Sequence, residues 1–181
     1  IRASKVIYDR RHSAITEFDF STVDINALLD GFTWLHLSGI TPALGPNCRR
    51  LVMDCLRVAR EKGLTVSFDG NFRSTLWSWE EARDFCTECL PYVDVLLGIE
   101  PYHLWKDELD PTKGDIKDDI PYRPSYEQQD DVFQAFIRRY PNIKCIARHV
   151  RYAHSGSENS LKAFMWYEGH TFESKLFTFN I

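Results

Sequence analysis

The sequence predicts a three-layer α/β domain built on parallel strands. Apolar segments with strand character alternate along the middle of the chain with amphipathic segments of helical period. The order strand, helix, strand, helix requires crossover connections, and such connections join parallel strands. The 181 residues are 44% hydrophobic and 27% charged, a balance that suits one soluble domain with a buried core.

Four strands are predicted in the first half of the chain. They share β-branched and aromatic residues and end in polar or glycine-containing turns; they cover residues 4–10, 32–38, 64–68 and 93–98. A short helix is expected at 24–29, and a longer one begins near Pro42 or Pro46 and ends at Lys62, before Gly63. Ser78 and Glu81 form a capping box that opens the next helix.

The second half is predicted to contain helices and a hairpin. The helices are a short one at 100–107 and an amphipathic one at 125–140, separated by an exposed loop over 107–124. A strand at 143–147 is followed by a loop over 148–159. Two further strands, at 161–167 and 170–179, are joined by the hairpin signal Glu168-Gly169.

The charge balance narrows the classes of partner. There are 22 Lys and Arg residues against 26 Asp and Glu, so the net charge is −4 and we expect no nucleic-acid partner. No apolar run approaches the roughly 20 residues that a membrane-spanning helix needs, and no signal-peptide pattern opens the chain. We therefore expect a cytoplasmic protein with no membrane partner, while a local cationic pocket for a small anion stays compatible with this balance.

The five cysteines are predicted to be free thiols in a reducing compartment. Their number is odd, and most of them lie at apolar helical positions. Cys86 and Cys89 form a C-x-x-C near the end of a predicted helix, with no second pair at metal-ligand spacing. A redox pair would lie at a helix N-terminus. We therefore interpret these two residues as helix-face thiols.

The strongest candidate for chemistry is the segment Asp69-Gly70-Asn71-Phe72-Arg73. It follows a buried strand directly, and ligands of parallel sheets bind beyond the carboxyl ends of the strands. In an extended segment Asp69, Asn71 and Arg73 point the same way. Arginine suits carboxylate or phosphate, and aspartate suits a metal ion. The alternative interpretation is a polar loop with a structural Asp–Arg pair.

Three weaker candidates lie at other predicted strand ends. Tyr8 and Arg10 could bind a sugar hydroxyl and a small anion, or form a solvated strand end. Ser38-Gly39 could bring backbone close to a ligand, or form a plain turn between a strand and a helix. The segment 148–159, with its small polar and basic residues, could surround nucleotide phosphates or form a flexible surface loop. Its two histidines lie five residues apart, which is a weak zinc signal.

Taken in order, these segments resemble the ribokinase-like family of carbohydrate kinases. Within that family they are most similar to 2-keto-3-deoxygluconate kinases. The resemblance is collinear over about the first 105 residues and weaker beyond; it is carried by residues 6–10, 12–14, 34–44, 66–73, 76–78, 80–82 and 93–98. It implies an α/β/α sandwich with a small β lid, incomplete in this chain.

The resemblance also implies an activity, cofactors and residue roles. Such enzymes transfer the γ-phosphate of ATP to a sugar hydroxyl with the help of Mg²⁺. Tyr8 and Arg10 match the family's Tyr-x-Arg contact with the acid sugar, and Arg73 matches the substrate-binding arginine of Asp-x-Asn-x-Arg. Asp69 and Asn71 match that motif's polar residues near the phosphates and metal. By position alone, Arg148, Ser155 and Gly156 are assigned to ATP.

Two family motifs are not found in this chain. The Asn-x-x-Glu motif associated with the metal is replaced, since Ile99 and Tyr102 stand at its ends, and Glu100 is a weak substitute. The glycine-rich Gly-x-Gly-Asp segment with the catalytic base is expected after Ile181. We therefore expect residues 1–12 to belong to the lid and 13–181 to form the central portion of the kinase domain, truncated at both ends. Family lids often pack between subunits, which makes a homodimer plausible.

Two alternatives to this function stay open from the sequence. One is a kinase of the same family that acts on a neutral sugar such as fructose or ribose. The other is a non-catalytic α/β module with the same scaffold.

Overall fold

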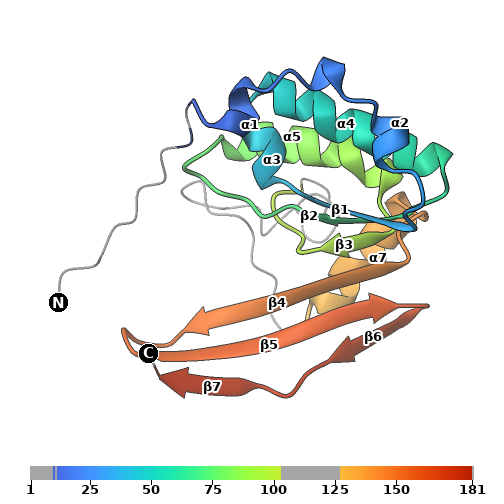
Figure 1. Ribbon diagram of the computed structural model, residues 1–181. Coiled ribbons are helices and arrows are strands. Elements are labelled where there is room, and N and C mark those ends of the chain that lie inside the picture. The colour runs from blue at the N-terminus through green and yellow to red at the C-terminus, as the bar shows by residue number, and fades with distance from the viewer. Residues whose placement is uncertain (1–9, 11, 103–126, 181) are drawn as a thin grey trace.

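The computed structural model of the protein describes residues 10, 12–102 and 127–180, and Figure 1 shows its course. The three long helices are α4 (Pro46–Glu61), α5 (Trp79–Cys89) and α7 (Gln129–Arg139), and a four-residue helix, α3 (Ile40–Ala43), precedes α4. Short helical turns are α1 (Ala14–Glu17), η1 (Phe20–Thr22), α2 (Ile25–Leu28) and η2 (Leu90–Tyr92). The strands are β1 (Trp34–Ser38), β2 (Thr65–Asp69), β3 (Val95–Leu97), β4 (Cys145–Ala153), β5 (Glu158–Tyr167), β6 (His170–Glu173) and β7 (Phe177–Asn180).

All of these strands form one mixed sheet. The first four are parallel and lie in the order β1-β2-β3-β4, and β5 then pairs antiparallel with β4. Strand β5 is long enough to pair with β6 along its second half and with β7 along its first half. The predicted strand 170–179 is therefore two strands, and Ser174 hydrogen-bonds Ala163 of β5 where the first one ends.

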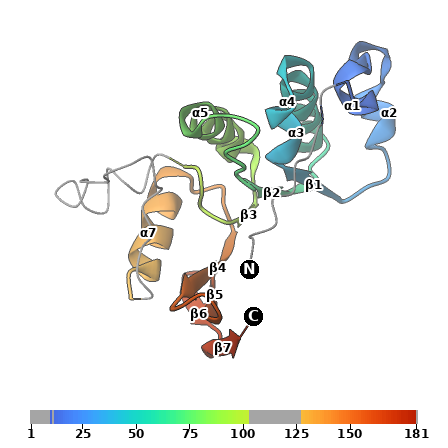
Figure 2. The ribbon, with the colours of Figure 1, turned by 90° about the vertical axis from the view of Figure 1, so that its left-hand side faces the viewer.

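The helices of the described chain cover one face of this sheet, as the two ribbon views show (Figures 1 and 2). In the order β1-β2-β3-β4, each strand lies beside the strand that precedes it in the sequence. The connections between them therefore all advance across the sheet in one direction. Right-handed crossovers that advance in one direction put every helix on the same side. The described residues thus form two layers of the expected three, and the predicted α/β arrangement of parallel strands with crossover helices is confirmed.

The hydrophobic core lies between the sheet and this helical layer. Alternate residues of the strands point into it, among them Phe68, Leu96 and Ile146, all fully buried. They pack against apolar positions of α4, α5 and α7, such as Leu56 and Phe133. The 3.6-residue spacing in the sequence predicted these helices because it puts the apolar positions on one helical face.

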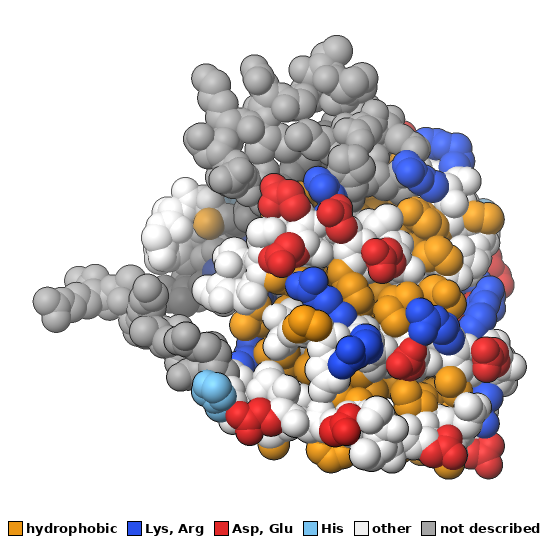
Figure 3. Space-filling view, turned by 90° about the horizontal axis from the view of Figure 1, so that it is seen from above, with side chains coloured by type: hydrophobic (Ala, Val, Ile, Leu, Met, Phe, Trp, Pro, Cys, Tyr) orange, Lys and Arg blue, Asp and Glu red, His pale blue; other side chains and the backbone are white. Residues whose placement is uncertain are grey.

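The outer face of the helical layer is polar and mixed in charge. In Figure 3, acidic and basic side chains alternate with apolar atoms over this face, and no broad basic patch gathers there. No helix in the described ranges is long and apolar enough to cross a membrane.

One predicted loop is wrong. The segment 148–159 was expected to be irregular, but β4 continues to Ala153 and β5 begins at Glu158. Nine cross-strand pairs, from Cys145 with Tyr167 to Ala153 with Asn159, hold the two strands together. Sequence periodicity missed this because the polar residues of β4 follow no simple alternation, and pairing with β5 supplies the backbone hydrogen bonds. The predictions for residues 1–9, 11 and 103–126 lie outside the described residues.

The C-x-x-C pair lies in the core, as the sequence predicted. Cys86 and Cys89 are fully buried on α5, and all five cysteines are free. Burial raises the pKa of the Cys86 thiol to about 12, with a smaller contribution from the Asp69 carboxylate. A thiol with so high a pKa is a poor nucleophile at neutral pH, which supports a packing role.

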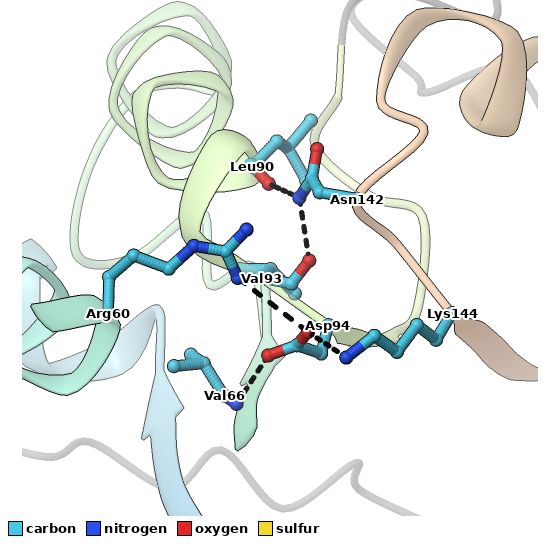
Figure 4. Close-up of polar contacts among 7 residues, drawn as sticks. All are labelled: Arg60, Val66, Leu90, Val93, Asp94, Asn142 and Lys144. Atoms are coloured by element: carbon cyan, nitrogen blue, oxygen red, sulfur yellow. Dashed lines mark hydrogen bonds and ion pairs between the residues drawn. The ribbon is translucent and has the colours of Figure 1, made fainter. Parts of the chain in front are cut away.

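The amino ends of the parallel strands are joined by one buried carboxylate (Figure 4). Asp94 precedes β3 and is 2% exposed. Its Oδ2 accepts from the backbone N–H of Val66 on β2 at 2.9 Å. Its Oδ1 lies 2.9 Å from Lys144 Nζ and 3.7 Å from Arg60 Nη1 at the end of α4. Close by, the Asn142 amide donates to the carbonyls of Leu90 and Val93.

Replacing Asp94 with Ala should lower the free energy of unfolding by about 2–4 kcal/mol. The substitution leaves the buried Val66 N–H without its acceptor and removes charge-assisted bonds. Urea denaturation of the full-length protein measures the change. The matched control is Asp54→Ala, because Asp54 pairs with Arg57 on the exposed face of α4; it should cost less than about 1 kcal/mol. Equal losses in the two variants would contradict the role given to Asp94.

Alkylation can test the state of the Cys86 thiol. Iodoacetamide at pH 8 should leave Cys86 unmodified in the native protein and modify it in urea, as peptide mass mapping would show. Because the folded pKa of about 12 lies above the ordinary 9.0, this thiol also lowers the free energy of unfolding as pH rises from about 9 to 12. Rapid alkylation of Cys86 in the native protein would show that this thiol is accessible to solvent and would contradict its burial.

Candidate active site

The candidate active site is a depression at the carboxyl ends of the parallel strands. Its volume is about 1110 Å³. Residues that follow β2 and β3 and residues of β4 itself contribute to its wall, and β5 and β6 close the far side. It is lined by Asp69, Asn71, Phe72, Arg73, Leu97, Gly98, Glu100, 147–151, Ala153, 163–165 and 172–174. This is the edge at which parallel α/β sheets bind their ligands.

The three polar residues of the leading motif all line this pocket. Asp69 ends β2, and Asn71 follows with a left-handed backbone, φ 41°. Asn71 N–H donates to Asp69 Oδ1 at 2.9 Å, which closes a tight turn. The sequence predicted an extended segment, and that geometry is wrong. The turn nevertheless directs Asp69, Asn71 and the exposed Arg73 to one pocket.

Two glycines let the strand ends approach one another closely. A Cβ on Gly39 would lie 2.1 Å from the carbonyl oxygen of Gly70, and one on Gly70 would lie 2.3 Å from that of Glu100. The Gly39 N–H also donates to the Asp69 carbonyl at 2.7 Å. The segments after β1, β2 and β3 are therefore in backbone contact. Ser38-Gly39 is therefore more than a plain turn between a strand and a helix, because Gly39 is in backbone contact with Asp69 and Gly70.

A partly buried ion pair forms one wall of the pocket. Arg148 on β4 donates from Nη2 to Glu100 Oε1 at 3.0 Å, and the Arg148 side chain is only 5% exposed. Charges in such a position need a partner because burial removes their hydration. The pair connects the end of β3 to β4, and it joins two residues that the sequence assigned separately, one to metal and one to ATP.

The pocket carries charges of both signs. Arginines 73, 148 and 151 and His149 bring cationic or proton-binding groups, and three carboxylates face them: Asp69, Glu100 and Glu173. The cations suit an anionic ligand such as a carboxylate or phosphate. His149 and Arg151 belong to the segment 148–159 that the sequence offered as a weaker candidate, whereas Glu173 was missed, because only the pairing of β5 with β6 brings it there.

The donor set suits a metal ion that arrives with its ligand. In the described ranges no group of three or more His, Cys, Asp or Glu side chains is placed to hold a metal. Mg²⁺ is usually held by one or two carboxylates together with phosphates and water. Asp69 fits that need, since Asn71 N–H occupies only its Oδ1. Glu100 is already paired with Arg148, which makes it a poorer candidate.

The remaining predicted residues lie elsewhere. Ser155 and Gly156 are exposed in the turn between β4 and β5 and do not line the pocket, so their assignment to ATP stays a prediction. Arg10 is half-buried and also does not line it. Tyr8 lies outside the described residues.

The chain is similar to several sugar-acid kinases. No protein-family profile matches it. It is 40% identical over 99 residues to the 2-dehydro-3-deoxygalactonokinase of Haloferax volcanii, an alignment that covers 55% of this chain and 31% of that protein.

Solved structures match along nearly the whole chain. The 2-dehydro-3-deoxygluconokinase of Thermotoga maritima aligns with a TM-score of 0.79 and 34% identity over 98% of this chain. A PfkB family carbohydrate kinase from Listeria grayi aligns with a TM-score of 0.76 and 30% identity over 97%. The chain spans about half the length of both structures, 50% in each case.

Gly39→Ala should destabilise the protein by about 1–3 kcal/mol, because the new methyl group collides with backbone rather than with a flexible side chain. Thermal unfolding of the full-length protein measures this. Gly156→Ala is the matched control, since a Cβ there meets nothing within 4 Å; its melting temperature should stay near that of the wild type. A Gly39→Ala protein as stable as the control would show that the strand ends are not in close contact.

Proposed function

The chain belongs to the ribokinase-like, or PfkB, family of carbohydrate kinases, and on that premise we propose that the protein containing it phosphorylates 2-keto-3-deoxygluconate with ATP and Mg²⁺. The observation that carries this proposal is the placement of Asp69, Asn71 and Arg73 in one pocket beside the Arg148–Glu100 pair. The Thermotoga maritima structure, named for this activity, supports the choice of substrate.

In the proposed reaction, Arg73 stabilises the negative charge that develops on the transferred phosphate. Phosphoryl transfer depends mainly on positioning and on stabilising negative charge as it develops. The Arg73 guanidinium is exposed at the pocket wall, where it can bind the substrate near the transferred phosphate. Arg10, which does not line the pocket of the described chain, would supply a second cation for the sugar carboxylate as part of the lid.

Asp69 and Asn71 act at the phosphate end. Mg²⁺, when bound with ATP, would neutralise phosphate charge, and Asp69 together with Asn71 would hold it through oxygen atoms or water. Arg148 keeps Glu100 in place at the same wall through their 3.0 Å contact. The base that takes the proton from the acceptor hydroxyl is assigned to the glycine-rich segment expected after Ile181.

A lid, a dimer contact and further ATP contacts complete the proposal. Residues 1–12, with Tyr8, would belong to a lid that closes over the sugar and excludes water as a competing acceptor. The same lid would form the contact of a homodimer. ATP contacts at Arg148, Ser155 and Gly156 and a cytoplasmic location belong to this proposal too.

A second substrate has an observation in its favour. The Haloferax volcanii relative, at 40% identity, is named for 2-dehydro-3-deoxygalactonate. The two acids share their carboxylate and keto group, so the same cations would bind either. A coupled assay of the full-length protein on both acids and on fructose and ribose decides between them. Turnover of a neutral sugar with none of either acid would overturn the proposal.

Arg10→Ala should raise the KM for the acid sugar about 10- to 100-fold and leave the KM for ATP within about threefold, because a charge-assisted bond to the carboxylate is lost. Steady-state kinetics measure both constants. Arg57→Ala, on the exposed face of α4, is the control for loss of an arginine, and both of its KM values should match the wild type. Equal changes in the two KM values of Arg10→Ala would contradict its contact with the sugar.

A further inference from the structure

We propose that Ser38 is a positioning residue that holds the Asn71 side-chain amide with its oxygen directed to the ligand. This inference rests on the proposed kinase function and adds a residue to it. Ser38 does not itself line the pocket, whereas Asn71 does. Its effect on the reaction would therefore pass through Asn71.

Strand pairing places Ser38 next to the motif. Ser38 ends β1 and is paired in register with Asp69, the last residue of β2. Its side chain lies on the sheet face that carries no helix in the described chain, as does that of Asp69, because alternate residues share a face. Ser38 Oγ accepts from Asn71 Nδ2 at 3.2 Å and from the Ile40 N–H at 3.3 Å.

The backbone of Asn71 needs this support. Its φ of 41° lies in the left-handed region, which costs a non-glycine residue about 1 kcal/mol or more. Asp69 Oδ1 binds its backbone N–H at 2.9 Å, and Ser38 binds its side chain. The two hydrogen bonds hold both ends of the residue, while Gly39 and Gly70 bring the two strand ends close enough for the second bond to form.

This arrangement determines what Asn71 offers to a ligand. An asparagine amide has a donor end and an acceptor end. Since one N–H of Nδ2 donates to Ser38, we infer that the Oδ1 atom is the end presented to the pocket. That atom accepts hydrogen bonds and can bind a hard cation, so the partner it suits is a hydroxyl of the sugar, Mg²⁺ or a water molecule bound to Mg²⁺. A bare phosphate oxygen, which has no proton, would not suit it.

The chain offers a matched comparison in Ser67. This serine is on β2 and is 4% exposed. Its hydroxyl lies 2.8 Å from both Trp34 Nε1 and His36 Nδ1, and within the described part of the chain it makes no hydrogen bond to Asn71. Loss of the Ser67 hydroxyl thus removes two hydrogen bonds from the same two strands without releasing Asn71.

The first experiment compares Ser38→Ala, Ser38→Thr and Ser67→Ala in the full-length protein. Ser38→Ala should lower kcat/KM about 10- to 30-fold, the loss expected for one hydrogen bond that orients a ligand-binding group. Ser38→Thr keeps the hydroxyl and should stay within about threefold of the wild type, as should Ser67→Ala. Wild-type kinetics in Ser38→Ala, or an equal loss in Ser67→Ala, would overturn the proposal.

Calorimetry then identifies the partner of Asn71. If Oδ1 binds Mg²⁺ or a metal-bound water, Ser38→Ala should weaken the binding of Mg²⁺ to the ATP complex and leave sugar binding unchanged. If it binds a sugar hydroxyl, the reverse should hold. Unchanged affinity for both ligands would count against the acceptor role.

A spectroscopic measurement keeps this test separate from the test of function. In protein labelled with ¹⁵N-asparagine, the Asn71 amide signals, identified by their loss in Asn71→Ala, should shift and exchange faster in Ser38→Ala but not in Ser67→Ala. Failure of the wild type to phosphorylate either acid sugar would refute the proposed function alone. Asn71 signals that are identical in the wild type and Ser38→Ala would refute the positioning role.

Discussion

The arrangement of the parallel strands depends on the contacts that the buried Asp94 carboxylate makes with β2, α4 and the segment before β4. Asp94 is 2% exposed, and it binds the Val66 N–H of β2, Lys144 before β4 and Arg60 of α4. The Asp94 carbonyl also accepts from the backbone N–H groups of Lys144 and Cys145. Because β3 is only three residues long, its own ladder contributes few hydrogen bonds. This buried charge and its partners set the position of β3 between its neighbours.

Holding β3 at its amino end has consequences at its carboxyl end. The strand leads within three residues to Glu100, whose carbonyl touches Gly70 and whose carboxylate binds Arg148. Gly70 in turn contacts Gly39, so the ends of β1, β2 and β3 are in contact through backbone atoms. A site built in this way is organised before any ligand arrives. Preorganised groups are what the phosphoryl transfer proposed above would require.

The polar contacts of the site are shared among strands far apart in the sequence. Ser38 and Asn71 meet across β1 and β2, and Glu100 and Arg148 meet across β3 and β4. Each pair is separated by more than 30 residues of chain. Spacing along the sequence carries no signal for such contacts. Only the parallel register, with Ser38 opposite Asp69 and Leu97 opposite Ala147, brings them together.

The sequence alone determined the order of strands and helices in the parallel half, the capping box at Ser78 and the buried thiols of α5. These follow from local periodicity and from side chains that act within a few residues. It also located the Asp69–Arg73 segment, because that segment directly follows an apolar strand.

Tertiary structure decided the rest. It extended β4 into a segment that the sequence predicted as a loop, divided the last strand at Ser174, and turned Asn71 into a left-handed conformation. It also paired Glu100 with Arg148 and Ser38 with Asn71. The physical reason is common to all of these: each depends on hydrogen bonds or close contacts with a neighbouring strand, and the identity of that neighbour is a property of the folded sheet.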